Sequence, residues 1–237
     1  MCSIAGVFSK NKKDIEHINV SLKHRGPDNS KIANFQGLQL AHNLLSIVGF
    51  VPQPLQSKNC ILIANCEIYN WESLCKSECI SAKNDSELLF LLLQKYKTNI
   101  SKAINLLNGD YAFAFFFKDK NKIKGYISRD IFGIKPLWYY LDKNNFYFSS
   151  ERKSFPIAIR SKAIDLNPRI LLNVNINTKT KKIILKEEYL GFFEQAITND
   201  NYNIAKTTTE KLIEESIKQR SKSDKKIAVL VSGGVDS

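Results

Sequence analysis

The stretch YAFAFFFKDKNKIKGYISRDIFGIKPLWYYLDKNNFYFSSE, residues 111–151, determines the fold class. It holds four segments rich in aromatic and β-branched residues, 111–119, 122–130, 136–142 and 145–151, with Lys, Asn and Gly between them. Such segments favour strands, and short polar turns favour antiparallel pairing. Phe113, Phe115 and Phe117 alternate as residues on one face of a strand do. The stretch therefore predicts an antiparallel meander with an aromatic core.

The residues around this meander extend the pattern. Apolar runs bounded by turn residues predict strands over 2–8, 38–50 and 60–69, and residues 169–190 predict a hairpin. Helices are predicted over 12–25, 85–96 and 101–107. The helix over 85–96 begins with Asp85 and ends near Lys95, in agreement with the helix dipole. Strands before and after a block of helices predict a layered α+β fold, with two antiparallel sheets facing each other and helices outside.

The pattern changes after residue 194. Residues 195–203 are polar and predict a linker, and residues 204–220 predict an amphipathic helix. The continuous apolar run over 225–231 is typical of a buried parallel strand. We therefore divide the chain into a first domain over 1–194, the linker, and the incomplete start of an α/β domain over 204–237.

Composition excludes several classes. The 35 Lys and Arg against 23 Asp and Glu give a net charge of +12, but these residues are scattered among turns, which predicts a solvated surface and no nucleic-acid partner. No apolar run is long enough for a membrane span, and no secretory signal begins the chain. The five cysteines form no CxxC pair and no metal pattern, so we expect a cytoplasmic protein without a metal site in this region.

Cys2 directly follows the initiator Met1. One reading is the buried start of a strand. The other is a nucleophile that is uncovered when Met1 is removed, because a free α-amine on the same residue can act as its base without a histidine. The residues alone leave both readings open.

Two resemblances decide between these readings. SGGVDS, residues 232–237 after an apolar strand, resembles the pyrophosphate loop of the ATP pyrophosphatases and implies an ATP site at Val231, Ser232, Gly233, Gly234, Asp236 and Ser237. The preceding chain resembles the class II glutamine amidotransferase domain of glutamine-hydrolysing asparagine synthetases, in the segments MCSIAGVF (1–8), HRGPDNS (24–30), ANCEIYN (64–70), NDSELL (84–89), RDIFGIKPLWYY (129–140) and FSSERK (148–153). This resemblance implies a four-layer αββα sandwich of the N-terminal nucleophile hydrolase type.

The resemblance also implies roles for individual residues. Cys2 is the nucleophile, and the Asn65 side chain with the Cys66 backbone N–H forms the oxyanion hole. Asp85 holds the α-amino group of glutamine, and Glu67 assists from the same loop. Leu44, Ser46, Ile47 and Val48 line the glutamine pocket. Arg25 reads either as an organiser of the first loops or as a surface arginine in a turn.

The sequence departs from the family pattern at two pocket positions. The family reads His-x-Arg-Leu-Ser where residues 42–46 read His-Asn-Leu-Leu-Ser, so Leu44 replaces an arginine that pairs with the α-carboxylate of glutamine. Loss of such a pair costs about 2–5 kcal/mol. Cys66 replaces a glycine, which would cost about 1–2 kcal/mol if the position required positive φ. We therefore expect weak or altered glutamine hydrolysis.

The expected function is release of ammonia from glutamine for ATP-dependent amidation of aspartate by a C-terminal domain largely absent from this chain. ATP and Mg²⁺ belong to the complete protein, and 1–237 alone is not expected to bind ATP productively. The family also allows a homodimer. Two alternatives stay open: a degenerate domain retained as a scaffold, and a related ligase with a different acceptor, such as a β-lactam-forming or peptide-modifying synthetase.

Overall fold

A computed structural model of the chain describes residues 1–191 and 201–234. The described residues divide into a first unit, residues 1–46 and 51–191, and a second unit, residues 47–50 and 201–234. No helix in these ranges is both long and apolar enough to cross a membrane.

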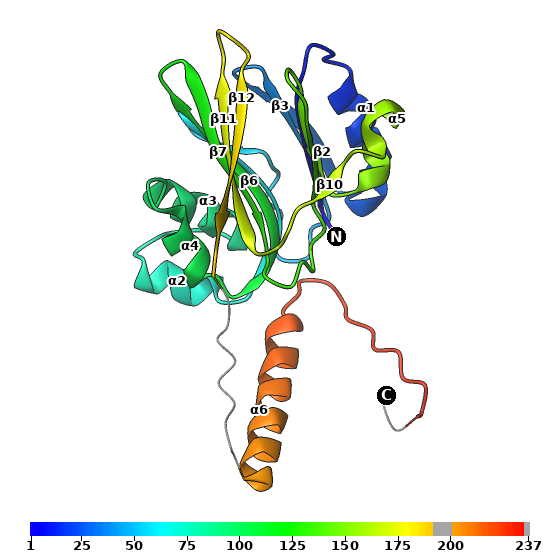
Figure 1. Cartoon of the computed structure of the whole chain (residues 1–237). Coiled ribbons are helices and arrows are strands. Elements are labelled where there is room, and N and C mark those ends of the chain that lie inside the picture. Colours follow the sequence, from blue (N-terminus) through cyan, green and yellow to red (C-terminus); the bar gives the residue numbers. More distant parts are fainter. Residues whose placement is uncertain (192–200, 235–237) are drawn as a thin grey trace. The chain divides into compact units, whose positions relative to one another are not determined.

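The first unit contains two six-stranded antiparallel sheets (Figure 1). The first sheet has the order β10-β8-β9-β1-β3-β2, and its strands are β1 (Ser3–Phe8), β2 (Asn29–Phe35), β3 (Leu38–Leu44), β8 (Trp138–Leu141), β9 (Phe146–Ser149) and β10 (Ile164–Asp165). The second sheet has the order β12-β11-β7-β6-β5-β4, and its strands are β4 (Leu55–Gln56), β5 (Cys60–Ile68), β6 (Gly109–Asp119), β7 (Lys122–Arg129), β11 (Ile170–Asn177) and β12 (Ile183–Tyr189).

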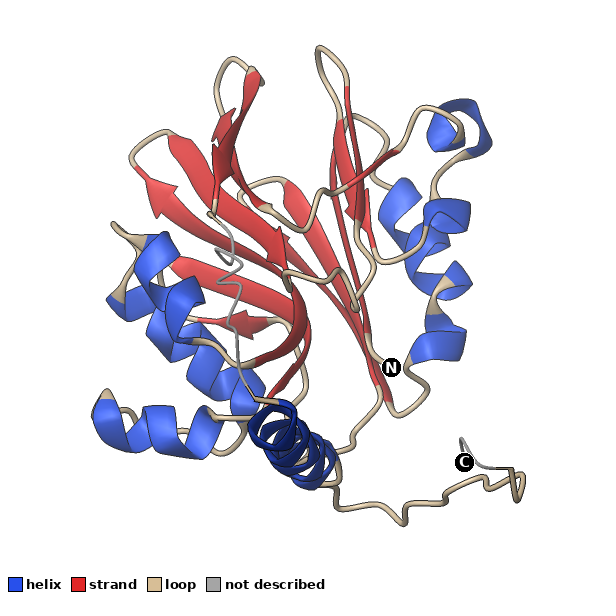
Figure 2. Ribbon diagram, turned by 60° about the horizontal axis from the view of Figure 1, so that its bottom comes forward, coloured by secondary structure: helices blue, strands red, loops and turns tan. Residues whose placement is uncertain are grey.

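Helices cover the outer face of each sheet (Figure 2). The second sheet carries α2 (Trp71–Ser77), α3 (Asp85–Lys95) and α4 (Ile100–Leu106), and the first carries α1 (Asp14–Ser21), α5 (Ile157–Arg160) and the short 3₁₀ turns Lys23–Arg25 and Arg152–Ser154. The predicted αββα layering is confirmed. The helix α2 and the strands β2, β4 and β10 were not predicted, because their segments are short or alternate weakly.

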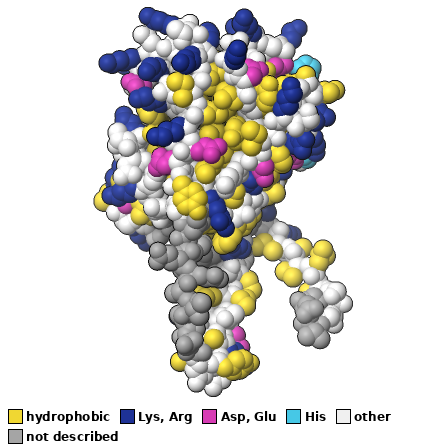
Figure 3. All heavy atoms as spheres, viewed as in Figure 1, with side chains coloured by type: hydrophobic (Ala, Val, Ile, Leu, Met, Phe, Trp, Pro, Cys, Tyr) yellow, Lys and Arg dark blue, Asp and Glu magenta, His cyan; other side chains and the backbone are white. Residues whose placement is uncertain are grey.

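The core is built in three layers of side chains. Ile4 and Phe8 of β1 meet Ile61 and Ile63 of β5 and Phe116 of β6 between the two sheets. Phe113 and Phe115 face the other way and pack under α3 and α4, so the alternation of the aromatic run puts side chains into two of these layers. This confirms the aromatic core predicted for the stretch. On the surface seen in Figure 3, Lys and Arg side chains gather at the top, where the hairpin turns of Figure 1 lie. Hydrophobic side chains lie nearer the middle of this surface.

Two predicted elements differ from the structure. The strand predicted over 38–50 ends at Leu44, and the following residues leave the sheet. The strand predicted over 225–231 does not form: these residues have no regular structure, and Leu230 is 97% exposed. A buried parallel strand needs a neighbour on each edge for its backbone hydrogen bonds, and no strand pairs with this run in the described part of the second unit. That unit contains α6 (Tyr202–Arg220).

Candidate active site

Cys2 lies immediately before β1, a strand in the interior of its sheet between β9 and β3. Ile4 and Phe8 of this strand face the opposite sheet, so strand alternation directs Cys2 to the same inter-sheet side. The thiol is partly buried, and its Sγ accepts a hydrogen bond from the Leu45 N–H at 3.3 Å. Burial raises the pKa of Cys2, and the charges of Glu67 and Asp85 raise it further. The thiol therefore needs a base before it can act as a nucleophile.

Arg25 holds the backbone of Cys2 in place. Its Nε donates to the Cys2 carbonyl at 3.1 Å, and its Nη1 donates to Glu151 at 2.9 Å. Glu151 also contacts His24 at 3.1 Å and Lys153 at 3.0 Å. Burial raises the pKa of Glu151, but the hydrogen bonds from Arg25, Lys153 and His24 outweigh it and lower this pKa to about 2. The contact with Cys2 favours the reading of Arg25 as an organiser. No local sequence pattern indicates this role of Glu151.

The end of β5 brings Asn65 and Glu67 to the inter-sheet face. They continue the every-second-residue pattern of Ile61 and Ile63, which pack between the sheets, and so lie on the same face of β5. Asn65 is 2% exposed, and its Nδ2 has no hydrogen-bond partner among the described residues. Because an unpaired buried amide is costly, Asn65 has the character of a donor reserved for a ligand.

Cys66 presents its side chain and its backbone in different directions. Cys66 lies opposite Tyr111 of β6, and the Tyr111 carbonyl accepts the Asp130 N–H, so the backbone groups of Tyr111 point away from β5. The backbone N–H of Cys66 therefore points to the β5 edge away from β6. The side chain points to the helix-covered face with Ala64 and packs there. The conditional expectation of strain is wrong: Cys66 is an ordinary strand residue without positive φ, so its β-carbon carries no such cost.

Asp85 is the first residue of α3, directly after the N-cap Asn84. Its carboxylate accepts the N–H of Ile68 at 3.0 Å and of Ser86 at 2.7 Å, and the Cys66 thiol also donates to it. Burial raises the pKa of Asp85. Burial and the charge of Asp85 raise the pKa of Cys66 well above its ordinary value. The Cys66 thiol is therefore a neutral donor to Asp85 and not a second nucleophile.

Opposite charges meet around the chain start. Burial and the charge of Asp85 raise the pKa of Glu67 to about 7, although Lys135 lowers it. Burial lowers the pKa of the Met1 amine, and Arg25 and Lys135 lower it further. The charge of Cys2 raises this pKa, but the Met1 amine is still unprotonated at a lower pH than an exposed amine. Lys135 was not predicted as a site residue.

The other predicted glutamine-pocket residues are divided between the units. Leu44 ends β3, is buried, and its carbonyl accepts the Asp28 N–H at 3.0 Å. The Ser46 N–H donates to the Asp28 carboxylate at 2.8 Å. Ile47 and Val48 belong to the second unit, where the Ile47 carbonyl accepts the Asp224 N–H at 2.9 Å.

The predicted ATP residues are described only in part. Val231, Ser232, Gly233 and Gly234 are exposed, and a Cβ added to Gly233 would meet nothing within 4 Å. These residues therefore form no cradle for phosphate. Asp236 and Ser237 lie outside the described residues.

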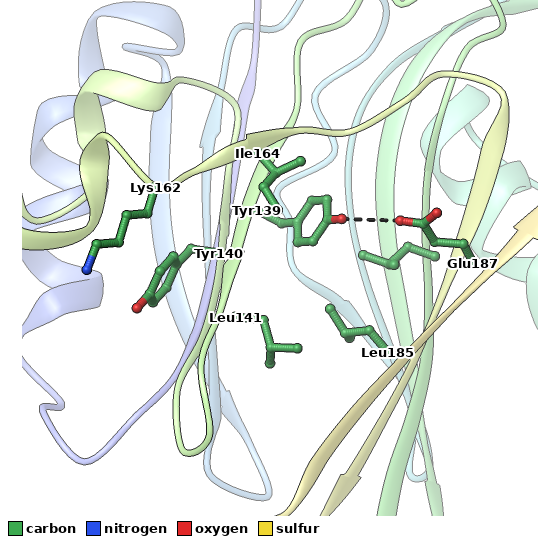
Figure 4. Close-up of a pocket in the computed structure, with 8 residues that line it drawn as sticks. Tyr139, Tyr140, Leu141, Lys162, Ile164, Leu185 and Glu187 are labelled. Atoms are coloured by element: carbon green, nitrogen blue, oxygen red, sulfur yellow. Dashed lines mark hydrogen bonds between the residues drawn. The ribbon is translucent and has the colours of Figure 1, made fainter.

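A separate cavity of about 580 Å³ lies among β8, β10, β11 and β12 (Figure 4). Tyr139 points across it to Glu187, with a hydrogen bond of 3.3 Å. Its lining includes none of the predicted site residues. Among residues 1–191 and 201–234 no group of three or more His, Cys, Asp or Glu side chains could hold a metal ion.

The two facing sheets with helices outside define the fold of the N-terminal nucleophile hydrolases. The first unit shares this fold with glutamine phosphoribosylpyrophosphate amidotransferase from B. subtilis, at a TM-score of 0.60 and 18% identity over 81% of this chain and 50% of that chain. Residues 1–187 match the family model of the glutamine amidotransferase domain. The chain belongs to the class II glutamine amidotransferase family.

Curated relatives refine this placement. The chain is 30% identical to a putative glutamine-hydrolysing asparagine synthetase 1 of Methanocaldococcus jannaschii, over 100% of the chain and 50% of that protein. It is also 30% identical to the glutamine-hydrolysing asparagine synthetase B of Escherichia coli, over 100% of the chain and 43% of that protein. The chain spans about half the length of the curated relatives it matches.

Proposed function

We propose that this chain hydrolyses the side-chain amide of glutamine through a thioester on Cys2 and releases ammonia. The observation that carries the proposal is the Nδ2 of Asn65, which is buried, has no hydrogen-bond partner in the described part of the chain, and lies on the inter-sheet side to which Cys2 also faces. A nucleophile and a reserved hydrogen-bond donor are the two parts that acyl transfer from an amide requires.

The reaction begins after removal of Met1 frees the Cys2 α-amine. The amine takes the thiol proton, and Sγ attacks the amide carbon of glutamine. Asn65 Nδ2 and the Cys66 N–H then donate to the oxyanion of the tetrahedral intermediate. The protonated amine returns its proton to the leaving nitrogen, the C–N bond breaks, and ammonia departs. Water, deprotonated by the same amine, cleaves the thioester to glutamate and the free thiol.

The carboxylates beside the thiol select the substrate. Asp85 is buried and carries two backbone N–H bonds that fix its direction. It receives the α-ammonium of glutamine, and Glu67, whose pKa is raised by burial and by the charge of Asp85, adds negative charge nearby. An amino acid with a free α-amine is therefore favoured over a peptide-bound glutamine.

The acceptor of ammonia belongs to the complete protein. The names of the relatives support aspartate, amidated by an ATP-dependent domain that follows residue 204, and the division 1–194, 195–203 and 204–237 stays a prediction. The described loop residues do not fit ATP in this chain, so no step here runs through ATP or Mg²⁺. A ligase of the same family with another acceptor remains the alternative for the complete protein.

Replacement of Cys2 by alanine tests the proposal. Glutamate release from glutamine, followed by mass spectrometry, is expected to fall to background in Cys2→Ala. Cys75→Ala on α2, a partly buried cysteine without a proposed role, is the matched control and is expected to keep full activity. An intact mass that retains Met1 in an active preparation would contradict the mechanism, because Cys2 would then have no free α-amine.

The scaffold reading keeps one supporting observation. Leu44 is a buried apolar residue at the position where the family has its carboxylate-binding arginine. If the chain releases no glutamate, and millimolar glutamine does not raise its melting temperature, the domain is a scaffold and the proposed hydrolysis fails.

A further inference from the structure

Lys135 is a lysine buried beside the chain start, and within residues 1–191 and 201–234 it has no carboxylate partner. It lies in the loop between β7 and β8 and is 7% exposed. Its backbone is fixed on both sides: the N–H donates to Asp130 at 3.0 Å, and the carbonyl accepts Arg129 Nε at 2.9 Å. Lysine is almost never this buried unless its charge is paired. The backbone of Lys135 is therefore held in place. Burial of its charge without a partner is unfavourable, and an anion would stabilise it.

The contacts of the ammonium do not supply that anion. Lys135 Nζ lies 3.8 Å from the thioether Sδ of Met1, and sulfur is a weak acceptor. Among the described residues no carboxylate oxygen forms an ion pair with this Nζ. The proposed mechanism removes Met1, so the active chain loses the thioether contact as well. A buried ammonium left in this way is stabilised by a bound anionic group.

The charge of Lys135 acts on the same groups that surround the thiol. It lowers the pKa of the Met1 amine, of Cys66 and of Glu67, in each case after the larger effect of burial. Arg25 also acts on the Met1 amine, but its guanidinium is already bonded to Glu151 and to the Cys2 carbonyl. Lys135 is thus the cation of this cluster that holds no carboxylate.

We propose that Lys135 binds the α-carboxylate of glutamine and so replaces the cation that Leu44 does not provide. This inference rests on the proposed function. A zwitterionic amino acid presents one ammonium and one carboxylate from the same carbon, and the site offers Asp85 for the first and Lys135 for the second. A substrate with a neutral group in place of the α-carboxylate leaves the buried ammonium unpaired. The site therefore discriminates against such a substrate and in favour of glutamine.

The test compares two substrates in two chains. Wild type and Lys135→Met are assayed with L-glutamine and with L-glutaminamide, whose α-carboxylate is an uncharged amide, and the products are identified by mass. For glutamine, Lys135→Met is expected to lose roughly 30-fold or more in kcat/KM, mainly through KM. For glutaminamide, the two chains are expected to agree within about threefold. Lys135→Arg keeps a cation and is expected to restore most of the preference for glutamine.

Controls separate binding from folding. Lys162→Met, at an exposed lysine of the cavity in Figure 4, is expected to leave kcat/KM unchanged for both substrates. Melting curves check each variant, and Lys135→Gln serves as a second neutral variant if Lys135→Met does not fold. As a readout without turnover, glutamine is expected to protect Cys2 from iodoacetamide in wild type, and not in Lys135→Met.

Failure of the inference and failure of the function give different results. If wild type releases no glutamate and glutamine does not protect Cys2, the proposed function fails. If wild type is active but the neutral variants lose kcat/KM equally for both substrates, or for neither, Lys135 does not bind the carboxylate and the inference is overturned.

Discussion

At the scale of single residues, the site contains two thiols and one amide that behave differently. Burial keeps Cys2 protonated until a base removes its proton, and it keeps Cys66 neutral beside Asp85. Asn65 differs from these groups because it does not titrate. Its amide is a fixed dipole with a free donor, and its effect belongs to the transition state and not to substrate binding.

We expect Asn65→Ala to lower kcat for glutamine hydrolysis by about 10²- to 10³-fold with little change in KM, as for loss of one oxyanion donor. Steady-state glutamate release measures both constants. Asn173→Ala, at a partly buried asparagine of β11, is the matched control. A rise in KM with an unchanged kcat would show that Asn65 binds the ground state instead.

At the scale of elements, the end of β5 and the start of α3 form one structural unit. The Asp85 carboxylate accepts the Ile68 N–H, which joins the strand to the helix. Two side-chain bonds hold the helix start: Asn84 Oδ1, at the N-cap, accepts the Glu87 N–H at 3.0 Å, and the Glu87 carboxylate accepts the N–H of the preceding residue Lys83 at 2.6 Å. The cap therefore sets where Asp85 lies relative to Asn65 and Glu67.

Asn84→Ala is expected to lower the free energy of unfolding by about 1 kcal/mol and to raise KM for glutamine more than it lowers kcat. Urea unfolding gives the first value and steady-state kinetics give the second. Asn99→Ala, which removes the similar cap of α4 away from Asp85, is expected to cost stability without a change in KM. Equal effects of both variants on KM would show that the cap does not position Asp85.

At the scale of the whole first unit, His42 joins the two sheets. Its Nε2 donates to the carbonyl of Ala64 at 3.1 Å, which Gln53 Nε2 also reaches at 3.1 Å. His42 belongs to β3 and Ala64 to β5, so the bond crosses between sheets. Burial lowers the pKa of His42 to about 4, although the bond to Ala64 raises it. The imidazole is neutral in the folded chain at neutral pH.

Acid is expected to weaken the packing of the sheets through His42. Because its folded pKa lies below the ordinary value of 6.5, its contribution to stability is complete above pH 6.5 and is lost as the pH falls toward 4. The loss is about 2–4 kcal/mol in the free energy of unfolding. Urea unfolding of wild type and His42→Gln at several pH values measures it as the difference between the two chains, in which the opposite effect of Glu67 cancels. His17→Gln, at an exposed histidine of α1, is the control, and an equal slope in wild type and His42→Gln would contradict the assignment.

The sequence by itself determined the two-sheet layering, the main strands and helices, and the position of Cys2 at the head of a strand. These features follow from local alternation and turn residues, which act over a few positions. The family resemblance already implied Asn65, Glu67 and Asp85 at the site, and only the tertiary structure added Glu151 and Lys135. Arg25 reaches Glu151, and Lys135 reaches the chain start, across more than a hundred residues, and no local pattern encodes such a meeting. The apolar run over 225–231 was likewise not decided by local pattern. It predicted a strand that does not form, because a strand needs neighbours to complete its hydrogen bonds.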